Sequence, residues 1–218
     1  NHDPIGPLLS TTWNQDEPYN NQTPYYGVSN NQYVYSKEDV SGYSHCVTGC
    51  SATAMAQVMN YHKWPQEATS SIPAYKWESA NIWLPAKNTD LTGTTFDWNN
   101  MADSYSGTTT PAQQTAVATL MKYCGYSVEM NYGPTSSAGL ASAYNAFTSY
   151  FGYNSDKIKH YRRFMYTYSS WVDMIYNELK EGRPVLYAGQ AVDEGHAFVC
   201  DGYKYDGADL FHINWGWG

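Results

Sequence analysis

The order in which two hydrophobic patterns occur along the chain limits the fold most strongly. Apolar residues recur at helical spacing in separate segments up to about residue 180, whereas residues 184–215 are β-branched and aromatic in a strand pattern. Helices that come early, followed by neighbouring strands, favour an antiparallel sheet segregated from the helices. The sequence therefore predicts an α+β fold.

Four helices are predicted, each from apolar spacing together with a start or stop signal. Their expected bounds are Cys50–His62, about 110–125, about 138–150 and about 170–182. Thr110-Pro111 supplies an N-cap and a proline at the first helical position of the second helix, and Gly125 is expected to close it. Ser170 and Asp173 form an S-x-x-D start for the fourth.

Three strands are predicted after the last helix, at Pro184–Gln190, His196–Lys204 and Asp209–Trp215. Asp206-Gly207 is typical of a hairpin turn between the last two. Residues 1–45 are turn-rich, and their four prolines are expected to break any regular element. Residues 66–110 are expected to form irregular surface loops. No repeat and no linker divides the chain, which predicts one domain.

Composition excludes several classes of protein. The chain has 218 residues and a net charge of −8, which argues against a protein that binds nucleic acid through phosphates. No apolar run approaches the ~20 residues that cross a bilayer. A cluster of four basic residues, Lys157, Lys159, Arg162 and Arg163, is interpreted as a solvated face. The cysteine spacing matches no zinc pattern, so neither metal nor cofactor is expected.

Cys50 is the candidate nucleophile. It lies at the predicted start of the first helix, where the positive end of the helix dipole stabilises a thiolate. Its own N–H has no partner within the helix, so the same residue offers a donor to an oxyanion. The alternative is a small buried apolar cysteine. Cys46 lies in a loop, and Cys124 and Cys200 occupy apolar positions that favour packing.

A base for Cys50 is expected on the late hairpin. His62 shares the first helix but lies about 18 Å along it at 1.5 Å per residue. His196 begins a predicted strand after Gly195, at a position where a side chain projects from a sheet edge. His212 is interpreted as an ordinary strand residue. Asn214 lies on the partner strand, as a diagonal neighbour of His196 or with a bulge that resets the register, and its amide is expected to orient the imidazole.

Three segments resemble the streptopain family of secreted bacterial cysteine peptidases. They are residues 46–65 (CVTGCSATAMAQVMNYHKWP), 195–202 (GHAFVCDG) and 211–218 (FHINWGWG). The resemblance implies a papain-like fold with a helical lobe at roughly 12–110, a sheet-containing lobe at roughly 111–218, and an active site in the cleft between them. It also implies a zymogen-derived, virulence-associated enzyme outside the cytoplasm: secreted, at the cell surface or periplasmic.

Carried over residue by residue, the resemblance implies Cys50 as nucleophile and His196 as base. It implies Asn214 as the orienting amide and Trp215 as the indole that shields the His196–Asn214 hydrogen bond. Gln15, after Trp13-Asn14, matches the family's oxyanion-hole glutamine. Ser137 and Gly195 match a backbone-lined substrate pocket. The implied reaction is hydrolysis of peptide bonds through an acyl-enzyme, with a preference for a hydrophobic residue two positions before the cut.

The ends of the chain carry further expectations. The start at Asn1, without an initiator methionine, fits a processed form. The family continues beyond the position of Gly218, so the sequence suggests a truncated chain or one piece of a nicked enzyme. The expected partners are protein or peptide substrates, and either the enzyme's own propeptide or a separate C-terminal fragment.

Two rival functions are weighed against the peptidase. An aromatic-rich module without catalysis would bind carbohydrate or peptide through a platform of Trp64, Trp77, Trp83 and Trp98. An acyltransferase with a Cys-His-Asp triad is disfavoured, because an asparagine and not an aspartate follows on the last strand. A single fast-reacting thiol at Cys50 would discriminate the peptidase from the module.

Overall fold

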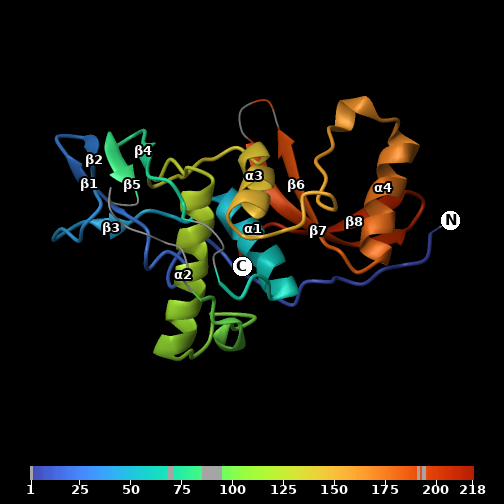
Figure 1. Ribbon diagram of the computed structural model, residues 1–218, viewed down its shortest axis with the longest axis horizontal. Coiled ribbons are helices and arrows are strands. Elements are labelled where there is room, and N and C mark those ends of the chain that lie inside the picture. Colours follow the sequence, from blue (N-terminus) through green and yellow to red (C-terminus); the bar gives the residue numbers. More distant parts are fainter. Residues whose placement is uncertain (1, 68–70, 85–94, 191, 193–194) are drawn as a thin grey trace.

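The computed structural model describes residues 2–67, 71–84, 95–190, 192 and 195–218. Helices and antiparallel sheets make up these residues, so the predicted α+β class is confirmed (Figure 1). The helices are α1 (Cys50–His62), α2 (Pro111–Ser127), α3 (Ala141–Ser149) and α4 (Tyr168–Lys180), with short 3-10 turns at Trp98–Asn100 and Arg163–Met165. The strands are β1 (Tyr25–Ser29), β2 (Gln32–Ser36), β3 (Ser44–His45), β4 (Tyr75–Trp77), β5 (Ile82–Leu84), β6 (Val185–Gln190), β7 (Gly195–Tyr205) and β8 (Asp209–Asn214).

Helix α1 has the predicted bounds and is the most buried element. Residues 51–60 are all buried. Gly49 precedes the helix at φ 87°, in the left-handed region, and a side chain there would meet Met130 at 2.6 Å, so only glycine fits. Lys63 ends the helix in the left-handed conformation, just before Trp64-Pro65. Cys50 therefore stands at the open end of a helix whose body is held in the core.

Two helix ends differ from the prediction. Helix α2 begins at Thr110 as expected, through a capping box with Gln113, but it runs past Gly125. Gly125 is not a stop signal: a side chain there would collide with Tyr132. Helix α4 begins two residues before Ser170, because Thr167 is the N-cap and its side chain accepts a hydrogen bond from the Ser170 N–H.

The sheet β6-β7-β8 matches the three predicted strands to within about a residue at each end. It is antiparallel throughout, and β7 and β8 join at the expected Asp206-Gly207 hairpin. A register shift between Cys200 and Gly202 places Asn214 opposite Val199. The alternative of a bulge is therefore confirmed, but Asn214 still lies three residues along β7 from the position opposite His196, and the alternative of a diagonal neighbour is wrong.

The segments expected to be irregular contain further strands. β1 and β2 form a hairpin whose turn residues Asn30 and Asn31 have φ of 52° and 60°, and β3 pairs with β1. All four N-terminal prolines precede β1, so they do not interrupt it. β4 and β5 form a second hairpin within the stretch expected to be loops. Residues 68–70 and 85–94 of that stretch lie outside the described residues.

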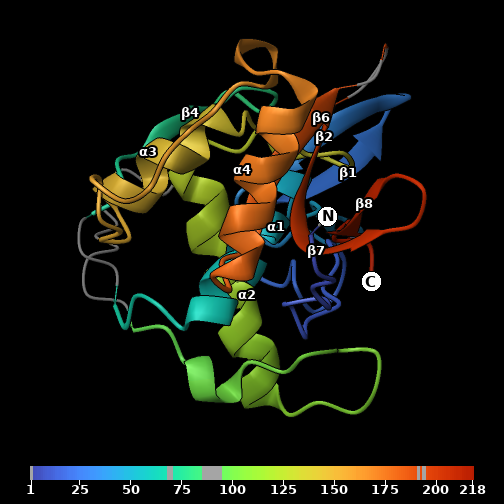
Figure 2. The same ribbon diagram turned by 90° about the vertical axis from the view of Figure 1, so that its right-hand side faces the viewer.

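Two hydrophobic cores lie on opposite sides of the late sheet. The larger core holds α1, α2 and α3, with buried members from Trp13 to Phe151. The smaller one packs Ile175 and Leu179 of α4 against Cys200 and Tyr203 of β7. The expected lobes at roughly 12–110 and 111–218 remain a prediction, since α2 and α3 share the larger core with α1. Val199, on the other face of β7, packs against Ala54 and Val58 of α1, so the sheet lies between α1 and α4 (Figure 2).

An N-terminal strap, residues 5–13, connects the sheet to α1. Ile5 pairs with Tyr203 through both backbone groups, and the Leu8 N–H donates to the Asp201 carbonyl. Further along, the Thr11 hydroxyl donates to Gln57 Oε1 at 2.7 Å. Figure 1 shows this segment running from the N-terminus along the sheet towards the centre of the molecule. The strap therefore contacts both elements that carry the candidate residues.

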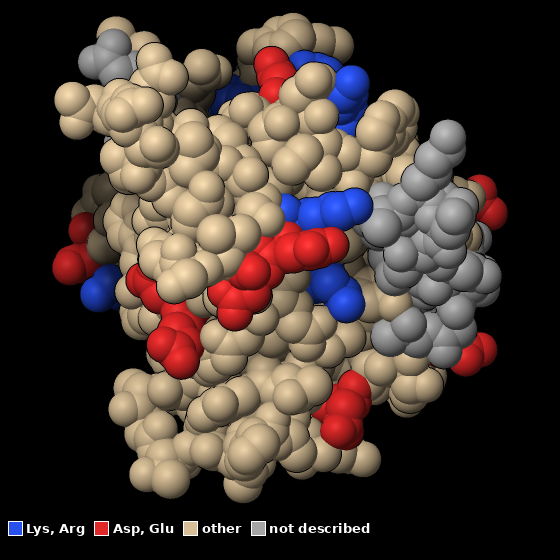
Figure 3. Space-filling view, turned by 90° about the vertical axis from the view of Figure 1, so that its left-hand side faces the viewer, with Lys and Arg blue, Asp and Glu red and all other residues tan. Residues whose placement is uncertain are grey.

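The surface is sparsely charged. Figure 3 shows a face of mostly uncharged side chains with a few acidic and basic groups mixed on it. Among the described residues, no helix is long and apolar enough to span a membrane.

Candidate active site

Cys50 and the start of β7 meet at the N-terminus of α1. Cys50 is the first residue of the helix and is half-buried, and no side chain caps this helix end. The Ala197 N–H donates a hydrogen bond to Cys50 Sγ over 3.4 Å. Ala197 directly follows His196 in β7. The fold thus brings the predicted nucleophile and the predicted base to one place.

The other three cysteines are buried away from this position. Burial raises the pKa of the Cys46 and Cys200 thiols to about 12, and it raises the pKa of Cys124 as well. A thiol with such a pKa stays protonated and unreactive near neutral pH. Among the four cysteines, Cys50 is the one that is half-buried instead of buried.

The ring of His196 is held by the segment that follows β8. Its Nε2 lies 2.8 Å from the Trp215 carbonyl oxygen. Because a carbonyl only accepts, this hydrogen bond places the proton on Nε2 and leaves Nδ1 as the nitrogen that can exchange a proton with a thiol. The ring also stacks on Trp217, with centroids 4.7 Å apart, and lies 6.0 Å from the Trp215 ring.

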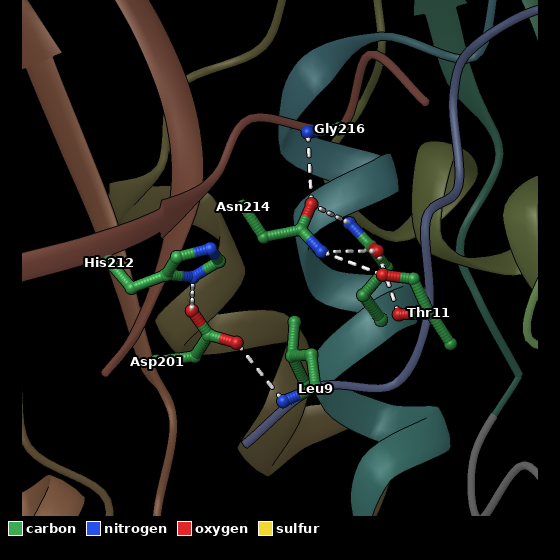
Figure 4. Close-up of polar contacts among 7 residues, drawn as sticks. Leu9, Thr11, Asp201, His212, Asn214 and Gly216 are labelled. Atoms are coloured by element: carbon green, nitrogen blue, oxygen red, sulfur yellow. Dashed lines mark hydrogen bonds and ion pairs between the residues drawn. The ribbon is translucent and has the colours of Figure 1, made fainter. Parts of the chain in front are cut away.

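No hydrogen bond joins the Asn214 amide to His196 among the described residues, which corrects the expected orienting amide. Its Nδ2 donates to the Thr11 carbonyl at 2.8 Å and to Gln57 Oε1 at 3.1 Å. Its Oδ1 accepts from the Gly216 N–H at 3.1 Å and from Gln57 Nε2 at 3.2 Å. Figure 4 shows the amide pointing at the strap and α1. Asn214 therefore fixes the turn at 214–216, whose Trp215 carbonyl holds His196.

Gln57 is a residue of this network that the sequence reasoning missed. It is fully buried in α1, and its Oε1 also accepts a hydrogen bond from Thr11. The sequence signal that could have identified Gln57 is its spacing of seven residues from Cys50. A residue seven positions along a helix lies on the same face two turns away, and a glutamine is unusual on an otherwise apolar, buried face.

Gln15 lies beside the start of α1. Its Oε1 accepts a hydrogen bond from the Gly49 N–H at 2.9 Å, and its backbone carbonyl accepts one from the Thr48 N–H at 3.2 Å. With Oε1 occupied, the orientation of the amide is set. No protein group among the described residues accepts a hydrogen bond from Nε2. The arrangement leaves these N–H groups free for a ligand next to Cys50.

Ser137 and Gly195 are the two expected substrate-binding positions, and each lies in a segment close to Cys50 or His196. Ser137 is exposed and pairs with Asn131 through both backbone groups. The next residue, Ala138, accepts a hydrogen bond from the Ser51 hydroxyl at 2.9 Å, which ties this loop to the first turn of α1. Gly195 is exposed at the start of β7, next to His196. A substrate role for either remains an expectation.

The other five histidines are engaged elsewhere. The partners of four of them are Asp173 for His2, the Thr23 carbonyl for His45, a stacked Tyr144 for His160 and Asp201 for His212. Burial and the nearby Arg183 lower the pKa of His62. The Asp201 carboxylate is 1 % exposed and accepts from the Leu9 N–H with its other oxygen, as Figure 4 shows. His212 thus has a structural partner, as its strand position suggested.

A metal site is not formed by the described residues. No group of three or more histidine, cysteine, aspartate or glutamate side chains gathers in a metal-binding arrangement there.

Comparison with known protein families shows which family this chain resembles. The model of the peptidase C10 family covers residues 13–218. Streptopain of Streptococcus pyogenes is 37 % identical over 210 residues, which is 94 % of this chain and 50 % of streptopain. The thiol protease/hemagglutinin PrtT of Porphyromonas gingivalis is 34 % identical over 227 residues, covering 98 % of this chain and 23 % of PrtT. The chain spans about half the length of the streptopains it matches.

Two solved structures of related cysteine proteases are also similar to this chain. The active wild-type interpain A cysteine protease of Prevotella intermedia superposes with a TM-score of 0.78 at 37 % identity, covering 98 % of this chain and 82 % of that one. A prointerpain A fragment from the same organism gives a TM-score of 0.79 at 38 % identity, covering 98 % of this chain and 62 % of that one.

Proposed function

The chain belongs to the peptidase C10 family, and from that premise we propose that it is a cysteine endopeptidase in which Cys50 and His196 form the reacting pair. One observation carries the proposal: the Ala197 N–H bonds to Cys50 Sγ, which joins the open end of α1 to the strand that begins beside His196. A nucleophilic sulfur needs a base within hydrogen-bond reach, and the base needs a group that orients it. The Trp215 carbonyl serves the second need.

The reaction proceeds in two steps. Nδ1 of His196 takes the proton of Cys50, and the thiolate attacks the scissile carbonyl carbon. The Cys50 N–H and Gln15 Nε2 donate to the oxyanion, and His196 gives its proton to the leaving amine. Water, with its proton taken by His196, then hydrolyses the acyl-enzyme. The Nε2 bond to Trp215 keeps the Nε2 proton in place and the ring oriented throughout, both when Nδ1 is free and when it carries a proton.

The substrate class follows from the family. The proposed substrates are proteins or peptides bound in extended form between two papain-like lobes, with a hydrophobic residue two positions before the cut. Ser137 and Gly195 are proposed to line that subsite. The solved prointerpain fragment supports a propeptide as a further partner. Streptopain and PrtT come from bacteria, and we propose a bacterial protein that acts outside the cytoplasm.

The rival binding module loses its main support. Its proposed platform used four tryptophans, but Trp77 and Trp98 are 0 % and 4 % exposed and belong to the core. Trp64 and Trp83 remain exposed, at 47 % and 51 %. Two separate rings do not make the expected platform.

Thiol labelling tests the proposed function. Iodoacetamide near pH 7 is expected to modify Cys50 rapidly and the three buried cysteines slowly, because burial raises the pKa of each buried thiol. Peptide mapping by mass spectrometry after brief exposure identifies the modified residue. Loss of fluorogenic-peptide cleavage should follow the Cys50 adduct in proportion. Equal, slow labelling of all four cysteines would contradict the proposal and favour a non-catalytic module.

Gln15→Ala is expected to lower kcat by roughly 10²- to 10³-fold with KM little changed, because an oxyanion donor acts mainly in the transition state. Steady-state kinetics on a fluorogenic peptide measures both constants. Gln22→Ala is the matched control: it also removes a glutamine amide, one bonded to Thr119 away from Cys50, and it should leave kcat within about twofold. A loss below about fivefold for Gln15→Ala would exclude the donor role.

A further inference from the structure

A row of aromatic rings leads away from His196 across the sheet. The successive centroid distances are 6.1 Å from His196 to Phe198, 5.2 Å to Tyr187, 6.0 Å to Trp171, 5.8 Å to Tyr166 and 5.9 Å to Tyr161. We call these five residues the aromatic row. Five steps of about 6 Å reach at most about 30 Å, the span of about nine extended residues.

The aromatic row is anchored to the sheet and α4 at its first three rings and is partly open to solvent. Phe198 and Tyr187 lie opposite each other in the β6–β7 ladder. Trp171 Nε1 donates to the Tyr187 hydroxyl at 3.0 Å, which fixes α4 against the sheet. The first four rings are half-buried and Tyr161 is exposed. Half-buried aromatic faces on a fixed framework offer apolar contact area at little entropic cost.

The row ends at a basic segment, residues 157–165. It carries Lys157, Lys159, Arg162 and Arg163, all exposed, which is four of the twelve Lys and Arg residues in a chain of net charge −8. None of the four has a carboxylate within ion-pair distance among the described residues. Phe164 and Met165 are 78 % and 67 % exposed. Ion pairs within the described part of the chain therefore do not account for the grouping of these cations.

Arg163 joins the basic segment to the aromatic row. Its guanidinium lies 6.0 Å from the Trp171 ring centroid and donates to the Tyr166 carbonyl at 2.8 Å. Figures 1 and 2 show the segment before α4 on the side of the molecule where β6 ends. Because β6 ends opposite Gly195, the first residue of β7, this is also the side of the molecule where His196 lies.

The chemistry of His196 decides which part of a substrate faces the aromatic row. The imidazole protonates the amine that leaves, so the residues after the scissile bond depart on the His196 side of Cys50. The acyl part stays bound to the sulfur. A surface that starts at His196 and leads away from Cys50 is therefore positioned for the departing half.

We propose that the aromatic row and the basic segment together bind the part of a polypeptide substrate that follows the scissile bond. The favoured substrates carry apolar or aromatic residues in the first positions after the bond and acidic residues about eight positions along, opposite Lys159 and Arg162. This inference rests on the proposed peptidase function and adds a second determinant of specificity to it.

Three substrates with the same sequence before the bond test the proposal. One ends in a coumarin leaving group, and two are quenched peptides with ten residues after the bond that carry two glutamates or two lysines near the far end. The acidic peptide is expected to have a kcat/KM about 3- to 10-fold above that of the basic peptide at low salt, and the difference should shrink at 0.5 M NaCl.

The double variant Lys159→Glu with Arg162→Glu is expected to reverse the preference and to leave coumarin release unchanged. The control Lys37→Glu with Lys180→Glu makes the same charge change at other exposed lysines and should keep the wild-type preference. An unchanged preference in the first variant would overturn the proposal, even if that variant lost affinity for anionic vesicles or oligonucleotides. Failure of the wild type to cleave the coumarin substrate would instead overturn the peptidase function itself.

Discussion

Replacing Cys50 with alanine is expected to lower kcat by about 10⁵-fold or more, because the sulfur that forms the acyl-enzyme is lost. Folding should be retained. Cys50 is half-buried at the end of α1, and its sulfur has one hydrogen bond among the described residues, from the Ala197 N–H. Cleavage of a fluorogenic peptide measures the loss of activity, and circular dichroism with a thermal melt checks the fold.

Cys46→Ala is the matched control for this variant. It removes one sulfur four residues earlier, from a buried thiol whose pKa burial raises to about 12. Its activity should stay within a few-fold of wild type, with a small fall in Tm from the lost packing. If Cys50→Ala retained more than about 1 % of kcat in a folded protein, Cys50 would not be the nucleophile.

Replacing His196 with alanine is expected to lower kcat by about 10⁴-fold, since the variant has neither a base for Cys50 nor an acid for the leaving amine. The rate of Cys50 alkylation near pH 7 should fall too, because no imidazolium remains to stabilise the thiolate. The Tm should change little, because the half-buried imidazole of His196 has one hydrogen bond to the described residues, to the Trp215 carbonyl.

His212→Ala is expected to have the opposite effect, a loss of stability with little loss of activity. His212 pairs with Asp201, whose carboxylate is buried, so its loss leaves that carboxylate short of a partner and should lower the Tm. Turnover by the folded fraction should remain near wild type. The assignment of the two histidines would be wrong if the variants exchanged these outcomes, with His212→Ala inactive and His196→Ala active.

Local signals predicted the elements that carry the site. The bounds of α1 follow from Gly49 before it and Lys63-Trp64-Pro65 after it, and the late strands follow from their β-branched and aromatic residues. These signals depend on neighbours in the sequence, so no tertiary knowledge was needed. The Asn30-Asn31 hairpin was missed because proline density was given more importance than the turn residues between β1 and β2.

Register and buried polar networks could not be predicted in the same way. A bulge was one of two alternatives for this hairpin, but no local pattern gives its position, which the structure has between Cys200 and Gly202. Asn214 was therefore assigned to His196, whereas its amide is fully used by Thr11, Gln57 and Gly216. The link between Gln15 and Gly49 likewise depends on how a distant loop packs.

The N-terminal strap has a consequence for how the molecule opens. One end of it is bonded to β7 at Tyr203 and Asp201, and the other end is bonded to Gln57 in α1. A local fluctuation that freed the sheet from the helix would have to break one of these two sets of bonds in addition to the packing of Val199 against α1. The strap therefore raises the free energy needed to separate Cys50 from His196, and the amide protons in the buried bodies of α1 and β7 should exchange slowly with solvent.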